Sequence, residues 1–309
     1  MAIACDGGRW QRLLGLRFAQ TVSSQTHEGL LDLLTVALLL VAALLHAGWH
    51  SLVKAGDDQV LMLAGMGLVA AIAALAVVPF VPVPPPVIWP VLAVSVVLHV
   101  GYKLCLSSAY AHGDLGEAFP LARGMVPPFA TGIAYATLGQ LPSLGQALGI
   151  VAVSAGLLAV MLERRRQANW RLWTAAAGAG LAVAAYTVLD AYGIRLFGNW
   201  LAFTCWLIVA DNVTFLALSR AARGPDVWRE LAKRRWRVLA SGALGLASFC
   251  VFLWALSRGP VGAVSALRET SMLFAIGLGI LIHREPMSAG RIGGALLMIL
   301  GIAAIAAGR

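Results

Sequence analysis

The stretches Ala109–Gly124 (AYAHGDLGEAFPLARG) and Ala255–Thr270 (ALSRGPVGAVSALRET) are two copies of one pattern, 146 positions apart. They align without a gap and share one alanine, two glycines and one leucine, at Ala109/Ala255, Gly113/Gly259, Gly116/Gly262 and Leu121/Leu267. Each copy is a basic, glycine-marked turn that leads into an apolar segment with an arginine several residues in. Internal repeats in a membrane protein indicate built-in pseudo-symmetry, and in transporters the substrate site commonly lies between the repeats.

The composition is that of a helical membrane protein with several crossings. Of 309 residues, 60% are hydrophobic and only 12% are charged, and the mean hydropathy is +0.83. Apolar runs of about 20 residues, the length that spans a bilayer core, recur along the chain. The net charge of +9 does not indicate nucleic-acid binding, because the basic residues lie between the apolar runs, where they set topology.

Ten apolar segments are expected to be transmembrane helices, at 32–54, 60–80, 88–111, 115–138, 143–162, 172–194, 199–219, 237–257, 260–283 and 289–307. They predict a polar, disordered tail at 1–30, a first five-helix repeat at 31–163, a basic linker at 164–171 and a second five-helix repeat at 172–309. Because five is odd, the second repeat enters the membrane from the opposite side. The predicted fold class is an all-α membrane protein with ten transmembrane helices in two inverted five-helix repeats, in which Gly149 aligns with Gly293.

Arg123 is a charge that the fourth segment must accommodate. It lies about two turns into that segment, and a charged side chain at the bilayer centre costs on the order of 2.5–3.5 kcal/mol. Pro120, Gly124, Pro127 and Pro128 surround it and weaken the helix. We therefore expect a broken helix that faces protein or a water-filled cavity. Two interpretations stay open: Arg123 lines a substrate cavity, or neighbouring carbonyls or an acid satisfy it structurally.

Arg268 and Glu269 occupy the equivalent place in the ninth segment. Consecutive helix positions diverge by about 100°, so these two charges cannot face one partner. One arrangement pairs Glu269 with Arg123 across the pseudo-twofold axis and leaves Arg268 facing the cavity. The alternative is an ion-pair cluster that only holds the two halves together.

The first and third segments carry basic and aromatic side chains at helical spacing. Lys103 lies four residues after His99, and a buried lysine has a partner acid or loses its proton. His46 and His50 flank Trp49. No carboxylate or cysteine is placed to complete a metal site with these histidines. Hydrogen-bonded imidazoles at helix contacts are the expected explanation.

The sixth and seventh segments carry two acids. Tyr186 and Asp190 are four residues apart and share a helix face, and Asp211 lies nearer the middle of its segment. Asp190 is expected to reach interfacial water, and either acid could carry a coupling proton. The candidate substrate-binding residues are Arg123, Arg268, Glu269, Lys103, His50, Trp49 and Tyr186. The sequence predicts no catalytic, cofactor-binding or metal-binding residue.

These motifs resemble EamA-type members of the drug/metabolite transporter superfamily. The resemblance rests on GDLGEAFPLARG before and through the fourth segment, on HAGWHSLVK closing the first, and on the repeated closing pair of segments. AYTVLDAYGIR and ALRETSMLF resemble a subgroup associated with phosphonate utilisation. The resemblance covers about residues 31–307. It implies a multi-pass carrier of the bacterial inner membrane, often an exporter of amino acids or other small metabolites, with its cavity between the repeats.

The leading hypothesis is a secondary transporter that works by alternating access. Arg123, Arg268 and Lys103 favour a small anionic or zwitterionic metabolite, such as an amino acid or a phosphonate, and the resemblance favours export. No GxxxxGK[ST] motif for ATP binding occurs. The alternatives are a membrane-embedded enzyme, for which HREP at 283–286 is the one suitable grouping, and a structural or channel-like component of an assembly. No cofactor is expected; the expected partners are a small-molecule substrate and the lipid bilayer, and a homodimer stays open.

The distribution of the 23 lysines and arginines predicts the side of the membrane on which the chain ends lie. Loops after odd-numbered segments carry 14 of them, and the termini and loops after even-numbered segments carry six. The positive-inside rule then places both termini outside the cytoplasm. Many EamA relatives have both termini inside, but the loop at 81–86 lacks the arginines that usually mark it as cytoplasmic. Compartment-sensitive reporters fused to each terminus should give a non-cytoplasmic signal; cytoplasmic signals at both ends would contradict this topology.

Overall fold

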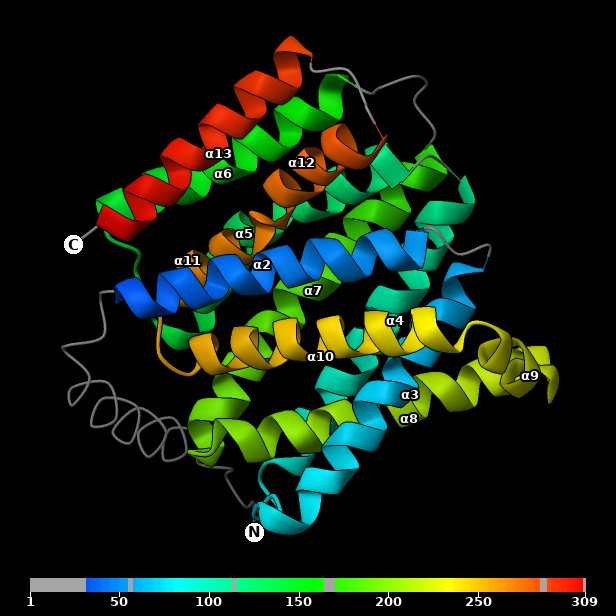
Figure 1. Cartoon of the computed structure of the whole chain (residues 1–309). Helices are drawn as coiled ribbons and strands as arrows, with labels where there is room; N and C mark the ends of the chain where they lie inside the picture. Colours follow the sequence, from blue (N-terminus) through cyan, green and yellow to red (C-terminus); the bar gives the residue numbers. More distant parts are fainter. Residues whose placement is uncertain (1–31, 55–57, 113–114, 164–169, 284–287, 308–309) are drawn as a thin grey trace, which may run out of the picture.

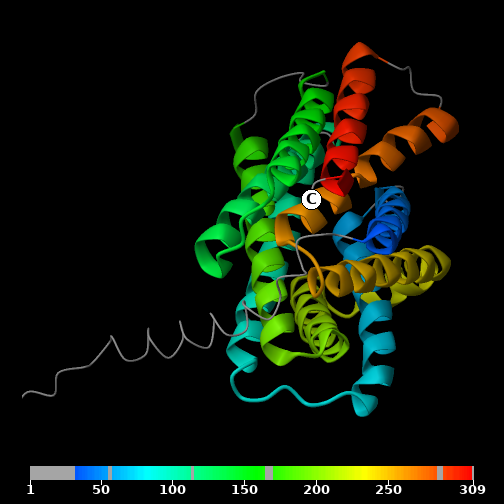
Figure 2. The same ribbon diagram turned by 90° about the vertical axis from the view of Figure 1, so that its left-hand side faces the viewer.

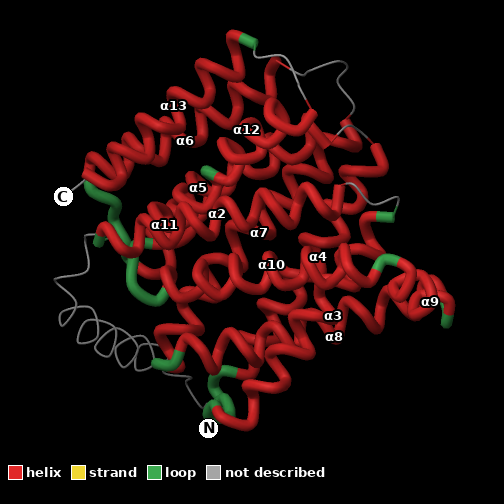
Figure 3. Tube along the Cα trace, viewed as in Figure 1, coloured by secondary structure: helices red, strands yellow, loops and turns green. Residues whose placement is uncertain are grey.

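The computed structural model describes residues 32–54, 58–112, 115–163, 170–283 and 288–307 (Figure 1). Helices joined by short loops make up this part of the chain (Figure 3). The expected N-terminal tail and most of the basic linker lie outside the described residues.

The helices lie within a few residues of the expected segments. The first half contains α2 (Leu33–Lys54), α3 (Gln59–Val77), the short 3-10 helix η1 (Val78–Phe80), α4 (Trp89–His112), α5 (Leu115–Leu138) and α6 (Leu144–Glu163). The second half contains α7 (Trp170–Phe197), α8 (Trp200–Arg223), α9 (Asp226–Lys233), α10 (Arg235–Leu256), α11 (Val261–Glu269), α12 (Ser271–His283) and α13 (Ala289–Ala307). The described chain begins and ends on one side, since α2 starts and α13 ends on the left of Figure 1, whereas α9 lies on the right.

Local sequence sets several helix boundaries. The Asp58 carboxylate accepts a hydrogen bond from the Leu61 backbone N–H at 3.0 Å and caps α3. The Asn199 side chain does the same for α8 through the Ala202 N–H at 2.9 Å. Gly224 ends α8 with a φ of 75°, a conformation that glycine adopts without steric cost.

The protein is an all-helical membrane protein. Seven of the described helices are long and apolar enough to cross a bilayer, namely α2, α3 with η1, α4, α7, α8, α10 and α13, and a shorter apolar stretch, Leu144–Val160, lies in α6. Large apolar side chains point away from the interior on the outer helix faces, for example Ile72, Val97 and Leu300. Such an outer surface suits lipid, because hydrocarbon does not penalise exposed apolar groups.

Two features differ from the expectations drawn from the sequence. The break expected around Arg123 is absent, because α5 is continuous from Leu115 to Leu138. The expected single helix at 260–283 is instead divided at Thr270 into α11 and α12. The Thr270 hydroxyl donates to the Leu267 carbonyl at 2.6 Å, and the Leu273 N–H bonds back to Thr270 with three-residue spacing. Side-chain competition for a backbone carbonyl therefore accompanies the break.

Helix α9 was not expected from the sequence. Its eight residues form a short amphipathic helix that buries Val227 and Leu231. These two side chains join a cluster with α2, α3 and α8 that includes Trp49 and Met62. Four of its eight residues are charged, so the segment lacks the apolar length by which the membrane helices were recognised.

The packing of the two halves against each other comes in matching pairs. Helix α4 packs on α7, and α10 packs on α2. Helix α3 packs on α8, α5 on α11, and α6 on α13. The α6–α13 pair forms one edge of the molecule and α3 with α8 another, as Figures 1 and 2 show. Every one of these contacts joins the first half to the second, so the main packing contacts run between halves.

Glycines bring the backbones of α6 and α13 into direct contact. A Cβ at Gly294 would lie 2.7 Å from the Gly156 carbonyl oxygen, and one at Gly301 would lie 2.7 Å from the Gly149 carbonyl oxygen. The order of these contacts shows that the two helices run antiparallel. Small residues permit such close approach between helices in lipid. Gly293, which the sequence alignment paired with Gly149, has open space at its Cβ position, so the contacts favour Gly294 as the counterpart of Gly149.

Adjacent glycines of α13 provide a test of this contact. Gly294→Ala should destabilise the protein by about 1–3 kcal/mol, because the added methyl group overpacks the helix contact. Gly293→Ala should be within about 0.5 kcal/mol of neutral, or stabilising, because alanine is the better helix former. The measurement is thermal unfolding of both purified variants in the same detergent. Equal midpoints for the two variants would contradict the described packing.

Candidate functional site

The buried polar residues gather where α2, α4, α5, α7, α8 and α11 meet. The charged or ionisable side chains with less than a tenth of their surface exposed in this region are His46, His99, Arg123, Asp190, Asp211, Arg268 and Glu269. Charges at this depth are expensive and occur mainly where they pair or serve a pathway. The partners of each group therefore decide what the region can do.

An ion pair between Arg123 and Glu269 joins the two halves of the chain. The Arg123 Nη1 donates to Glu269 Oε1 at 3.0 Å, and both side chains are 2% exposed. The two residues occupy equivalent positions in the repeated stretch, 146 residues apart. Tyr102 accepts a further hydrogen bond from Arg123 Nη2 at 3.2 Å. The pairing of Arg123 with Glu269, one of the arrangements expected from the sequence, is present.

His46 connects this ion pair to the end of α2. Its Nδ1 accepts a hydrogen bond from Trp49 Nε1 at 3.2 Å, and its Nε2 lies 3.1 Å from His50 Nε2 and 3.2 Å from Arg123 Nη2. Trp49 and His50 stack with ring centroids 3.6 Å apart. Trp49 Nε1 and Arg123 Nη2 can only donate, and a neutral imidazole has one acceptor nitrogen, so a neutral His46 ring accepts from one of the two at a time. Trp49 and His50 are thus linked through His46 to the central arginine.

Arg268 has no comparable partner. It is 7% exposed, and its Nε and Nη1 are buried without a hydrogen-bond partner among the described residues. The guanidinium carbon lies 4.1 Å from the centroid of the Phe252 ring, a cation–π contact. Arg268 also lies in the last turn of α11, where the helix dipole favours a cation. These contacts stabilise the positive charge of Arg268, but they use none of its N–H donors, so Nε and Nη1 can still donate to a ligand.

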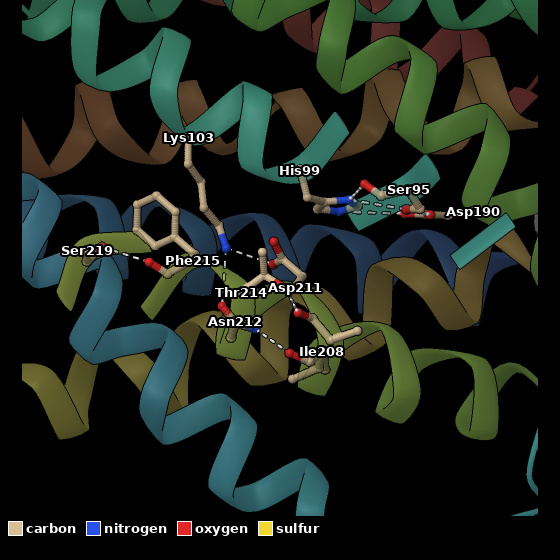
Figure 4. Close-up of polar contacts among 11 residues, drawn as sticks. Ser95, His99, Lys103, Asp190, Ile208, Asp211, Asn212, Thr214, Phe215 and Ser219 are labelled. Atoms are coloured by element: carbon tan, nitrogen blue, oxygen red, sulfur yellow. Dashed lines mark hydrogen bonds and ion pairs between the residues drawn. The ribbon is translucent and has the colours of Figure 1, made fainter. Parts of the chain in front are cut away.

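Lys103 has the partner acid that a buried lysine requires. Its Nζ donates to Asp211 Oδ2 at 2.7 Å and to Asn212 Oδ1 at 3.2 Å (Figure 4). The ammonium group also lies 4.8 Å from the Phe215 ring centroid. The Asn212 amide is oriented by its own bond to the Ile208 carbonyl at 2.8 Å. This ion pair joins α4 of the first half to α8 of the second.

A third polar group lies between α4 and α7. The Ser95 hydroxyl donates to Asp190 Oδ1 at 2.5 Å, and His99 Nε2 lies 3.7 Å from Asp190 Oδ2 (Figure 4). The His99 ring stacks on Tyr186 with centroids 3.8 Å apart. Asp190 is fully buried. The expectation that it reaches interfacial water is therefore wrong, because α7 extends to Phe197 and α4 covers this part of it.

The seven residues predicted to bind substrate fall into connected groups. Arg123, Glu269, Trp49 and His50 belong to the network around His46, and Tyr186 touches it through an edge-to-face contact with Tyr102 at 6.0 Å. Lys103 belongs to the pair with Asp211, and Arg268 stands apart from both. The sequence analysis missed Ser95, because one serine in an apolar helix carries no signal. HREP at 283–286 lies mostly outside the described residues.

Comparison with known proteins agrees with this architecture. A crystal structure of a protein 19% identical to the chain has the same fold, with a TM-score of 0.67 over 88% of this chain and 94% of that one. No curated protein matches the sequence. Residues 172–307 match the model of the EamA-like transporter family. The second half of the chain is therefore similar to an EamA-like transporter domain.

The Arg123–Glu269 pair can be tested by a double-mutant cycle. Arg123→Gln and Glu269→Gln should each destabilise the protein by about 3–5 kcal/mol, because each leaves one buried charge without its partner. The double variant should lose clearly less than the sum of the two, because it removes both charges. Thermal unfolding in detergent measures all four proteins. Additive losses would show that the two side chains do not interact.

Proposed function

We propose that the protein is a secondary transporter that moves a small anionic or zwitterionic metabolite, such as an amino acid or a phosphonate, by alternating access. The match of residues 172–307 to the EamA-like transporter family supports transport across a membrane as the general activity. The observation that carries the choice of substrate is Arg268, a buried guanidinium with two unpartnered nitrogens at the meeting point of the two halves.

The proposed architecture is two inverted five-helix repeats, 31–163 and 172–309, with α9 as an addition to the second. In this architecture α4 corresponds to α10, and α2 corresponds to α7. The packing of α4 on α7 therefore corresponds to the packing of α10 on α2, and the presence of both contacts supports the repeats. The last helices of the two proposed repeats, α6 and α13, pack against each other in antiparallel orientation, which supports it as well. Inverted repeats can exchange conformations, which opens a central site first to one side and then to the other.

Charge balance supports an anionic group on the substrate. Arg123 is matched by Glu269, and Lys103 is matched by Asp211. Arg268 is the cation of this region that no ion pair between described residues neutralises. A carboxylate, phosphonate or phosphate fits the flat fork of donors that a guanidinium presents. We assign Arg268 as the anion anchor. Lys103, Tyr186, Trp49 and His50 would line the approach, and Arg123 with Glu269 would hold the halves in register beside it.

The resemblance of the sequence extends the proposal to location and direction. We propose a bacterial plasma membrane, and export as the direction, driven by a metabolite that accumulates inside the cell. All residues of the proposed site come from one chain, so a monomer is sufficient for alternating access. A homodimer would add no residue to the site.

Transport in proteoliposomes tests the anion anchor. Radiolabelled amino acids, alkylphosphonates, inorganic phosphate and organic cations form the panel of probes. The wild-type protein should transport anionic or zwitterionic members, and Arg268→Gln should lower that transport about ten- to hundredfold, the effect of losing a charge-assisted hydrogen bond of about 1.5–3 kcal/mol. Arg268→Lys should retain part of the activity, because it keeps the charge and loses the fork.

Arg229→Gln is the matched control, because this arginine lies on the exposed face of α9 with 71% of its side chain accessible. It should transport at the wild-type rate. Membrane insertion and unfolding midpoints of all variants separate a lost binding group from lost protein. Transport restricted to the organic cations would overturn the assignment of Arg268.

A further inference from the structure

The donors and acceptors around Asp190 leave one position unsatisfied. The single hydroxyl proton of Ser95 is donated to Asp190 Oδ1 at 2.5 Å. Oδ1 is therefore an acceptor, and a proton on this carboxyl group would sit on Oδ2. That second oxygen is buried and has no hydrogen-bond partner among the described residues. A buried carboxylate oxygen without a donor is costly.

The tautomer of His99 follows from its contacts with Ser95. His99 Nδ1 lies 3.0 Å from the Ser95 carbonyl oxygen and 3.2 Å from the Ser95 hydroxyl oxygen. A carbonyl oxygen can only accept, so Nδ1 carries the ring proton and donates it. In a neutral ring the other nitrogen, Nε2, then has a lone pair. This nitrogen is also buried without a hydrogen-bond partner, and it faces Asp190 Oδ2 at 3.7 Å.

Two lone pairs thus face each other unless one proton lies between them. We propose that Asp190 and His99 form a proton-binding site, with one proton held between Oδ2 and Nε2, and that its loading and release couples transport to proton movement. The proton comes from water when the site opens and returns to water when it leaves, with no other bond made or broken. The coupling rests on the proposed transport function, whereas proton binding itself does not.

Other titratable and charged groups face the pair from every neighbouring helix. Asp211 of α8 and Arg268 of α11 interact electrostatically with Asp190, and Lys103 of α4 with His99. Tyr186 of α7 itself stacks on the imidazole ring. Arg123 comes from α5 and is paired with Glu269. From α10, the Phe249 ring makes an edge-to-face contact with the His99 ring, with the two centroids 6.0 Å apart.

The surrounding charges give the coupling a direction. The negative charge of unprotonated Asp190 partly balances Arg268, so proton binding leaves Arg268 freer to attract an anion. Anion binding in turn favours the protonated pair, because coupling between two ligands is reciprocal. Proton and anion are therefore expected to travel together. The site also spans the halves, since His99 lies on α4 and Asp190 on α7, so movement of one half relative to the other alters the contact that holds the proton.

Infrared difference spectroscopy of the protein in liposomes tests proton binding without any transported substrate. Between about pH 4 and pH 9, the range that covers ordinary carboxyl and imidazole titration, wild-type protein should show carboxyl and histidine bands that change together. Asp190→Asn should abolish this coupled step, because the asparagine amide can donate to Nε2 in place of the proton. His99→Gln provides a second variant and should abolish the step as well.

Asp226→Asn, on the exposed surface of α9, is the control and should keep the step unchanged. On a solid-supported membrane, a jump in pH alone should displace charge in wild-type protein and in Asp226→Asn, and not in Asp190→Asn. A coupled step that survives in both Asp190→Asn and His99→Gln, or that disappears only in Asp211→Asn, would overturn the proposal. So would wild-type protein that shows no titration over this range.

Transport assays keep the two proposals distinguishable. If the spectra show no coupled proton step, the expected effect of Arg268→Gln on transport is not changed. If Arg268→Gln does not lower transport, the spectroscopic evidence for proton binding is not changed. For a transported anion of the panel, the wild-type rate should rise as the pH falls. The rate of Asp190→Asn should not depend on pH in this way, and an identical pH profile for both proteins would overturn the coupling.

Discussion

The buried ion pair between Arg123 and Glu269 is the interaction around which the centre of this protein is organised. It joins positions that correspond in the two copies of the repeated stretch, so a single contact ties the halves together. A pair at this depth is weak evidence for net stability, because desolvation offsets much of the attraction. Its value is specificity: any other register of α5 against α11 would leave two charges buried without partners. The pair also makes the halves unlike each other, since the same place holds a cation in one and an anion in the other.

The sequence predicted the positions of most helices to within a few residues, because length and hydropathy are determined locally, and seven of the described helices are long and apolar enough to cross a bilayer. It also predicted the partner of Arg123, because the repeat aligns that residue with Glu269. It failed where the answer depended on three-dimensional neighbours. The prolines around Arg123 suggested a broken α5, yet the break lies at Thr270, where the sequence shows only a short polar run. The burial of Asp190 and the role of Ser95 follow from the packing of α4 against α7, which no local pattern reveals.

The three polar groups between the halves differ in how completely they are neutralised. Lys103 and Asp211 neutralise each other's charge, as Arg123 and Glu269 do, although Asp211 Oδ1 has no hydrogen-bond partner among the described residues. Arg268 and the Asp190–His99 pair are each incomplete, and each lacks a component that solution can supply. A carrier needs such groups, because a fully satisfied site has nothing to gain from a ligand. On the proposed function, the paired charges are structural, and the incomplete groups are the ones that bind the substrate and the proton.

The glycine contact between α6 and α13 divides the mechanical roles of the helices. Backbone lies against backbone at these glycines, and the side chains of Met298, Ile305, Val153 and Val160 pack beside them. In the proposed transport cycle, two helices packed this closely are suited to act as a fulcrum. The same geometry makes this edge unusually intolerant of mutation. Every replacement of Gly149, Gly156, Gly294 or Gly301 adds at least one carbon atom where the opposite chain already lies.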